Sequence, residues 1–409
     1  MVQDRYFDLF LSYSALAWIG ILLVENNWLV LRFNMKNITI LLSCTYFFHG
    51  CGKESQIEDI VEPEEIITFE KNVDNVKTAV RQTDDGGYIV AGGRGGQAWL
   101  LKLDKYGLEE WQNTYSLSDF GYNRSVVQTS NGGYLYASFD GIVKVDSNGV
   151  EEWKNERYSF YEDAIEHSNG SFYAVGGPSG GQAHLVKFSS NGALLTRKTF
   201  GSQCEDDIFR SIAETQDGML VVAGEKSHGN QSYDCAFNFM YYKDFWILKL
   251  KKNGGIIWEK TYGGPYMEKA DDIVVLEDGG YAVIGDKCDH DYDLQKCGPR
   301  AKVLYMRLNE DGYLIDEQSW SGLNFIERLP YFSITTTAYG GIAWAAEHKK
   351  KGSWIHKWGP NEETVSIFTN GYGGFDISKT MDDGFIIGTW GGILIKTDSD
   401  LYYEKLVDE

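Results

Sequence analysis

The sequence predicts an all-β protein assembled from repeats of one small sheet, and three observations support this. Aromatic residues make up 14% of the chain, Gly is abundant at 46 residues, and Pro is scarce at 6. Short alternating segments rich in Val, Ile, Leu and aromatic residues are bounded by Gly-containing turns throughout residues 66–409. The same order of segments then recurs along the chain. Many short strands joined by tight turns have this composition, whereas helical and disordered chains do not.

The repeat is most complete over residues 78–115, where it reads as four strands. Its first turn, Asp84-Asp85-Gly86-Gly87, suits a hairpin because Gly accepts positive φ angles. A four-stranded unit of about 40–50 residues has the length of one β-propeller blade. The sequence therefore predicts a seven-bladed β-propeller of four-stranded blades over residues 66–409. The predicted first-turn glycines are Gly86, Gly132, Gly170, Gly218, Gly279, Gly340 and Gly384.

The third and fourth strands of the repeat predict how neighbouring repeats pack. Third strands such as 99–104 and 246–250 are too apolar to face solvent, so we expect them between blades. Outer strands carry Trp at one recurring position, and a side chain repeated in register is typical of inter-blade packing. We therefore expect packing rather than stacking on sugars for Trp111, Trp153, Trp258 and Trp320.

Residues 66–71 resemble an outer strand such as 256–262, yet they precede the first repeat. We expect this segment to complete or reinforce the last blade beside Leu401–Lys405, because closure removes exposed sheet edges. An eighth blade would lack three of its strands.

The N-terminal region is predicted to direct export and membrane anchoring rather than to form a domain. Residues 35–50 begin with Met-Lys and continue with an apolar run, as a signal peptide does. The sequence Phe48-His49-Gly50-Cys51 resembles a bacterial lipobox, although the lipobox usually has Leu and a small residue where this chain has Phe48 and His49. This resemblance implies lipidation of Cys51, an acidic tether over 51–65, and an envelope protein anchored to the outer membrane, on its periplasmic or outer side. Residues 1–34 are interpreted as a mis-assigned upstream extension, with a membrane segment as the alternative.

Charge and cysteine content restrict the kinds of partner and the cellular compartment that we expect for this protein. The formal net charge is −21, and no long basic run is present, so a nucleic-acid partner is not expected. Membrane contact is expected only through the lipid anchor. Four cysteines in the repeat region fit two disulfides of an exported protein, Cys288 with Cys297 and Cys204 with Cys235. A zinc site is the alternative for these cysteines, but no CxxC pair occurs.

A pattern of motifs in the repeats resembles a known group of proteins. The motifs are DGGY followed by Ile or Val, then W-L-L-K-L-D, then W-x-K-T-Y-G. They resemble the propeller-type repeats of exported proteins and lipoproteins from Bacteroidota, most of which have no assigned activity. The resemblance covers residues 66–409. It implies a propeller fold and export, and it brings no catalytic residue.

The sequence contains one candidate metal site and no recognisable set of catalytic residues. The seven His are scattered, and no GxSxG or phosphate-binding Gly loop occurs, so an enzyme is not the favoured interpretation. Alternating acids suggest a Ca²⁺ site at Asp286, Asp289, Asp291 and Asp293, without the Gly and Glu of an EF-hand loop. No other cofactor is expected. Acids before the first strands could ring a channel and hold Ca²⁺, or simply cap turns: Asp119, Asp163, Asp206, Asp207, Asp271, Asp272 and Asp376.

Two neighbouring repeats carry long insertions between their second and third strands, Glu225–Lys243 and Asp286–Arg300. Loops on a rigid scaffold frequently bind ligands, and equivalent loops of successive blades lie side by side. The predicted function is a binding or scaffold module for an envelope protein or glycan. The alternatives are a structural flap with buried aromatics, or a polysaccharide lyase or hydrolase with its site at the channel mouth. The candidate binding residues are Tyr233, Phe237, Phe239, Tyr241 and Tyr242.

Overall fold

The computed structural model divides the chain into an N-terminal segment, Met1–Glu64, and a repeat domain, Glu65–Glu409. In the N-terminal segment it describes the backbone of three strands. In the repeat domain it describes residues 66–403 apart from short gaps. The gaps are 74–77, 119–124, 139, 157–159, 179–180, 203–205, 229–241, 265–266, 289–300, 322–330, 349–351, 360–361, 370–373 and 390.

The N-terminal segment contains an antiparallel three-stranded sheet of β1 (Ile21–Val24), β2 (Trp28–Met35) and β3 (Ile38–Ser43). The predicted signal peptide begins in β2, and Cys51 lies outside the described residues. No helix in the described part of the chain is long and apolar enough to cross a membrane. The lipid anchor and the signal peptide stay predictions.

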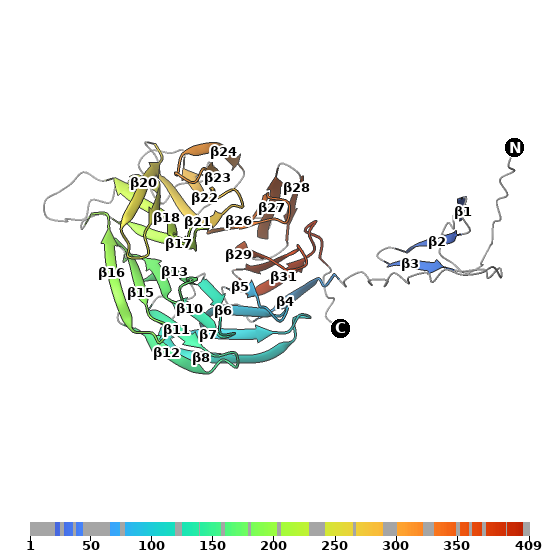
Figure 1. Ribbon diagram of the computed structural model, residues 1–409, viewed down its shortest axis with the longest axis horizontal. Coiled ribbons are helices and arrows are strands. Elements are labelled where there is room, and N and C mark those ends of the chain that lie inside the picture. The colour runs from blue at the N-terminus through green and yellow to red at the C-terminus, as the bar shows by residue number, and fades with distance from the viewer. Residues whose placement is uncertain are drawn as a thin grey trace, which may run out of the picture. The chain divides into compact units, whose positions relative to one another are not determined.

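The repeat domain is all-β, as predicted, and its 28 strands form four-stranded antiparallel units (Figure 1). Repeats 1 to 3 consist of β5 (Ala79–Gln82), β6 (Tyr88–Arg94), β7 (Gln97–Leu103), β8 (Glu109–Ser118); β9 (Ser125–Gln128), β10 (Tyr134–Ser138), β11 (Gly141–Val145), β12 (Glu151–Asn155); and β13 (Tyr161–Glu166), β14 (Phe172–Gly176), β15 (Ala183–Phe188), β16 (Leu194–Phe200).

Repeats 4 and 5 form one eight-stranded sheet, because a single parallel bridge, Lys243 to Met267, joins them. Their strands are β17 (Ile208–Glu214), β18 (Leu220–His228), β19 (Tyr242–Leu250), β20 (Ile256–Tyr262), β21 (Met267–Val275), β22 (Tyr281–Cys288), β23 (Ala301–Leu308) and β24 (Leu314–Ser321). Repeat 6 consists of β25 (Phe332–Thr336), β26 (Ile342–His348), β27 (Gly352–Gly359) and β28 (Glu362–Phe368). Figure 1 shows the sheets arranged around a central axis, with the first strand of each repeat innermost.

The closing strand comes from the start of the domain. Repeat 7 has three strands of its own, β29 (Gly374–Lys379), β30 (Phe385–Thr389) and β31 (Ile393–Thr397), and β4 (Phe69–Asn72) is its fourth. The expected role of residues 66–71 is thus found, with one correction. β4 pairs with β31, whereas Leu401 belongs to the turn that follows β31, and residues 404 and 405 lie outside the described part of the chain.

The outer-strand tryptophans lock one repeat to the next, as expected. The indole N–H of Trp111 donates to the carbonyl of Ser147 at 3.2 Å, and its ring lies 5.8 Å from that of Tyr134. Trp153 and Trp258 make the same two kinds of contact with the repeats that follow them. The prediction was wrong for the position of Trp320: repeat 5 has Asp316 there, and Trp320, four residues later, packs on Trp344 of repeat 6 at 5.4 Å. In the closing strand Phe69 takes the place of Trp: it packs on Tyr88 at 5.4 Å and lies directly against Gly107.

Second strands end on Gly because the neighbouring inner strand bulges toward them. The register of the inner strand shifts by one residue between Tyr161 and Asp163, and again before Ser211 and Asp272. A Cβ at Gly176 would lie 1.8 Å from the Phe160 carbonyl, so no other residue fits there. A bulge of this kind re-aims the side chain that follows it.

One predicted turn glycine is misplaced by one residue. The positive φ of the first turn falls on Gly86 in repeat 1 but on Asp383 in repeat 7, at 60°. Gly384 corresponds instead to Gly87, where a Cβ would meet a backbone carbonyl. The Asp-Gly pair of repeat 7 therefore keeps the close-approach Gly and places Asp in the left-handed position.

Third-strand lysines form a further repeated feature, which sequence reasoning missed. Lys102, Lys144 and Lys396 are buried, and each ammonium donates to a backbone carbonyl and to a carboxylate of its own repeat. The carbonyl acceptors lie at 2.7–3.0 Å. In the sequence these residues read as the single polar residue of an apolar strand.

The closing strand generates the first prediction. Replacing Phe69, which is 3% exposed, by Ala should lower the free energy of unfolding by about 3–5 kcal/mol, the usual cost of truncating a buried Phe. The control is Ile66→Ala, because Ile66 is 63% exposed and should cost under ~0.5 kcal/mol. Denaturant titration measures both, and equal losses for the two variants would contradict the role of Phe69.

Candidate ligand-binding face

The two insertions begin and end in one continuous row of backbone pairs. Ser227 pairs with Lys243, Lys243 with Met267, Met267 with Cys288, and Cys288 with Ala301. This row lies where β18 and β22 end and where β19 and β23 begin, so it forms the base of both insertions. We call this end of the repeat domain the insertion face. The expected adjacency of the two loops is therefore present at their bases.

A buried network of charges lies beneath the first insertion. The guanidinium of Arg210 donates to Glu225 Oε1 from Nε at 2.9 Å and from Nη2 at 2.7 Å, and to Glu162 Oε1 from Nη1 at 3.1 Å. Lys243 Nζ binds Glu225 Oε2 at 2.5 Å and Asp206 Oδ2 at 2.8 Å. Burial alone would raise the pKa of Glu225, but Lys243 and Arg210 hold that pKa well below its ordinary value. The network fixes the strand ends from which the insertion departs.

A second buried group lies at the base of the other insertion. Lys269 Nζ lies 3.0 Å from Asp286 Oδ1 and 3.5 Å from Asp271 Oδ2, and all three side chains are at most 2% exposed. Burial raises the pKa of Asp286 to about 7, and although Lys269 opposes this shift, the charge of Asp271 adds to it. Burial and Asp271 thus favour the neutral form of Asp286, whereas Lys269 favours its charged form.

The predicted Ca²⁺ site is represented by Asp286 alone. The ammonium of Lys269 already provides a cation for this carboxylate. Asp289, Asp291 and Asp293 lie outside the described residues, and no group of three potential metal ligands occurs in the part that the structure describes. The metal site stays a prediction.

The carboxylates near the axis join neighbouring repeats. Asp163 accepts from Ile212 N at 2.9 Å, Asp272 from Ile334 N at 2.9 Å, and Asp376 from Val80 N at 2.8 Å. These three acids occupy the same position of the inner strand in repeats 3, 5 and 7. That position carries Ser in repeats 2, 4 and 6 and Ala in repeat 1, and we call the ring of seven residues the belt. Its residues are Ala79, Ser125, Asp163, Ser211, Asp272, Ser333 and Asp376.

Two of the three serines of this belt link two carboxylates each, whereas Ser125 bonds to the backbone of Ala164. Ser211 Oγ lies 2.7 Å from Asp272 and 3.3 Å from Asp163, and Ser333 Oγ lies 3.0 Å from Asp272 and from Asp376. Repeat 1 has Ala79 in place of Ser, and there Arg81 Nη1 binds Asp376 at 2.5 Å. Burial, with the charge of Asp272, raises the pKa of Asp163 to about 6. These acids bind protein donors, so the belt holds the repeats together.

A Tyr and a His come together near the insertion face, a pair that a lyase would need. The rings of Tyr161 and His184 are edge to face, with centroids 5.6 Å apart. Both side chains are at most 1% exposed, and burial lowers the pKa of His184 to about 4. A substrate cannot reach a pair buried between repeats, so this geometry does not favour the lyase alternative.

Most of the sequence-predicted site residues lie outside the described residues. Cys288 is buried at the end of β22, and Tyr242 is described only as backbone in β19. The residues not described are Cys51, Cys204, Cys235, Cys297, Tyr233, Phe237, Phe239 and Tyr241. Sequence reasoning missed Arg210, Glu225 and Lys269. A usable signal was that the residue before the inner-strand Ser or Asp is charged in three successive repeats, as Glu162, Arg210 and Asp271.

Comparison with known proteins identifies the fold. No family model matches the chain, and no curated protein matches it. Streptogramin B lyase is 12% identical over 81% of this chain and 97% of its own, with a TM-score of 0.54. The WD40 domain of Neurospora crassa Pan2 is 9% identical (80% and 93% covered, TM-score 0.54), and that of Doa1 is 12% identical (80% and 94%, TM-score 0.51). These structures establish that residues 65–409 resemble β-propellers, and at this identity they show the fold alone.

The charge network generates the second prediction. Glu225→Gln leaves Arg210 and Lys243 buried without their shared counter-charge, which should cost about 3–5 kcal/mol at pH 7. Because the pKa of Glu225 is below its ordinary value of 4.5, the stability that its charge contributes is present above that pH and is lost as pH falls through the folded pKa. The difference between variant and parent should therefore shrink in acid.

Glu259→Gln is the matched control for this network. Its carboxylate is 33% exposed and pairs with Lys226 at 2.6 Å, so the loss should stay below ~1 kcal/mol. Denaturant unfolding at pH 7 and pH 3 measures both variants. A cost for Glu225→Gln no larger than that of the control would show that the network does not anchor the insertion.

Proposed function

We propose that this protein is a lipid-anchored binding or scaffold module of the bacterial cell envelope, and that it binds a protein or glycan on the insertion face. The observation that carries the proposal is the single row of pairs from Ser227 to Ala301, which roots both insertions in one sheet. Buried ion pairs hold that base rigid. A rigid base presents two adjacent loops as one surface, which lowers the entropic cost of binding.

The module is a seven-bladed propeller in this proposal. Repeats 4 and 5 touch through one bridge only, and each has its own four strands, so we count their sheet as two blades. The residues of the belt also support an odd number of blades. Two residue types cannot alternate around a closed ring of odd size without one break, and the alternation of Ser and Asp breaks once, at Ala79.

The disulfides proposed from the sequence would brace the same loops. Cys288 is 4% exposed and pairs in register with Ala301, and Cys297 precedes Ala301 by four residues. A Cys288–Cys297 bridge would close the second insertion near its base. Cys204 is close in sequence to Asp206, which binds Lys243 at the base of the first insertion, so Cys235 is its proposed partner.

Loop replacement tests the binding face. A variant in which a short Gly-Ser turn replaces residues 229–241, and a second that replaces 290–299, should each lose at least ~10-fold in affinity for the ligand, as interface residues at the centre of a contact do. The probes are a glycan array and cross-linked envelope extract of the source cell. The control changes the first turn of repeat 6, Ala338→Ser with Tyr339→Asn, at the opposite end of the sheets.

Ligand recovery in equal amounts by parent and loop variants would refute the binding face, provided that thermal melts show both variants folded. A ligand lost only by the control would point to the opposite face instead.

The anchor is tested separately. Cys51→Ser should release the protein from the membrane fraction into the soluble fraction, because two acyl chains or more are what hold a lipoprotein stably on a bilayer. Mass spectrometry of the mature parent protein should find an acylated Cys51 at its N-terminus. The proposed lipid anchor would be contradicted if Cys51→Ser stayed fully associated with the membrane, or if residues 1–34 were recovered in the mature chain.

A further inference from the structure

The end of the sheets opposite the insertion face gathers exposed apolar side chains. Because each repeat is an antiparallel meander, its first turn and its second turn lie at this end, which we call the turn face. Among the described residues, the large hydrophobic side chains that remain exposed lie in or beside these turns, apart from Ile66 and Phe368. Scattered apolar side chains are normal on protein surfaces, but their collection on one face indicates an interaction surface.

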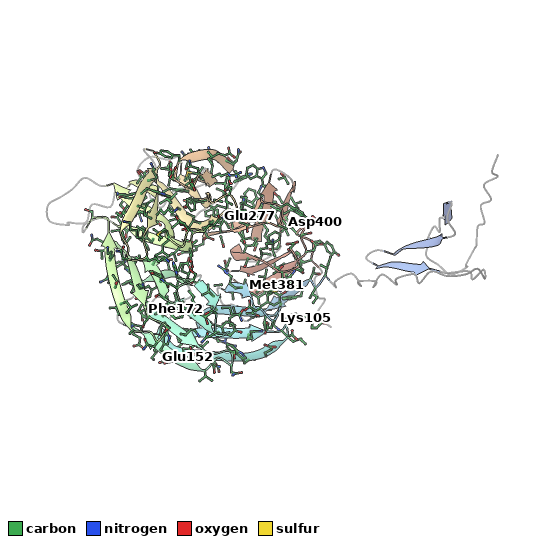
Figure 2. The ribbon with its side chains drawn as sticks, in the orientation of Figure 1. Lys105, Glu152, Phe172, Glu277, Met381 and Asp400 are labelled. Carbon is green, nitrogen blue, oxygen red and sulfur yellow. The ribbon has the colours of Figure 1, made fainter. Side chains whose placement is uncertain are left out.

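The sector of this face formed by repeats 7, 1 and 2 holds three of the four most exposed of these side chains, and the fourth is Tyr339 of the neighbouring repeat 6, which is 66% exposed. Leu108 is 63% exposed, Val150 is 61% exposed and Met381 is 64% exposed. Leu108 and Val150 follow the Gly of the second turn in repeats 1 and 2, and Met381 lies in the first turn of repeat 7. Figure 2 labels Lys105, Met381 and Asp400, which come from turns of this sector. A polar residue would satisfy each of these turns equally well.

The same sector is strongly acidic. Six carboxylates in its turns form no ion pair within the described residues: Asp84, Asp104, Glu109, Asp146, Glu151 and Asp398. Lys102, Lys144 and Lys396 are buried in third strands and already bind carbonyls and other carboxylates. Lys154 and Lys379 are partly exposed, but each pairs with a carboxylate at 3.0 Å, Lys154 with Glu156 and Lys379 with Asp383. The exception is Lys105, whose ammonium lies 4.7 Å from the ring of Tyr106. The charge available to a partner is therefore negative.

We propose that the turn face of repeats 7, 1 and 2 docks a basic polypeptide segment that also carries apolar side chains. Charge complementarity selects this occupant over the others. A second copy of the chain would present the same negative charge, and an anionic lipid surface would be repelled. The chain's own flanking segments, 51–65 and 404–409, are themselves acidic. This surface lies opposite the proposed ligand face, so it gives the module a second, independent partner.

Binding of a defined probe tests the proposal on the folded full-length protein. The probe is a fluorescein-labelled peptide of Lys, Leu and Ser, and its counterpart has Glu in place of every Lys. Anisotropy at 150 mM salt should detect the basic probe only. Asp84→Asn with Glu109→Gln and Glu151→Gln should weaken binding about 10-fold, since exposed charge pairs contribute modestly and add up. Leu108→Ser with Val150→Ser and Met381→Ser should weaken it about as much.

The matched controls lie in repeats 4 and 5 of the same face. Glu277→Gln with Glu310→Gln and Asp311→Asn removes the same number of charges. Ile257→Ser with Tyr313→Ser and Ile315→Ser removes the same number of exposed hydrophobic side chains, which are 44%, 60% and 58% exposed. Both controls should bind the probe within about 2-fold of the parent. If the charge control weakens binding as much as the sector variant, the attraction is only the net charge of the protein. If the apolar sector variant binds normally, there is no docking site, and either result overturns the proposal.

Discussion

Every repeat of this protein has two apolar faces that only neighbouring repeats can cover, and this constraint decides the rest of the structure. Third strands such as Gln97–Leu103 are buried on both faces, so a single repeat would expose most of its core. The same contacts between repeats therefore recur along the chain. Trp111 packs on the next repeat, Asp163 accepts a backbone N–H from the next inner strand, and β4 closes the sheet that begins at the far end of the chain.

The fold could be predicted because this constraint leaves periodic traces in the sequence. Gly pairs mark hairpin turns, and Trp recurs at one register because the same inter-repeat pocket recurs. The bulge before Asp163 left no such trace, since one extra residue in a strand changes no composition. The offset of Asp383 was missed for a related reason: Asp also tolerates the left-handed region, so the turn does not require Gly there.

The candidate site was harder to predict than the fold, because charge in a sequence carries no sign of burial. Glu225 and Lys243 read as the solvated ends of an insertion, yet they are 1% and 11% exposed and bind each other. Asp286 read as the first acid of a metal loop, whereas Lys269 from the neighbouring strand lies against it. In both cases the partner is distant in sequence, and only the pairing of β18 with β19 and of β21 with β22 brings the two charges together.

The two ends of the sheets differ in how they handle charge, and this difference follows from the strand connections. At the insertion face the charges at the strand ends are buried and must pair with one another, as Arg210 does with Glu162 and Glu225. At the turn face the connections are tight hairpins, so Glu109 and Glu151 are exposed to solvent. Buried charges position loops, whereas hydrated charges attract partners from solution. One fold thereby separates a base of buried, paired charges from an acidic surface that carries exposed apolar side chains.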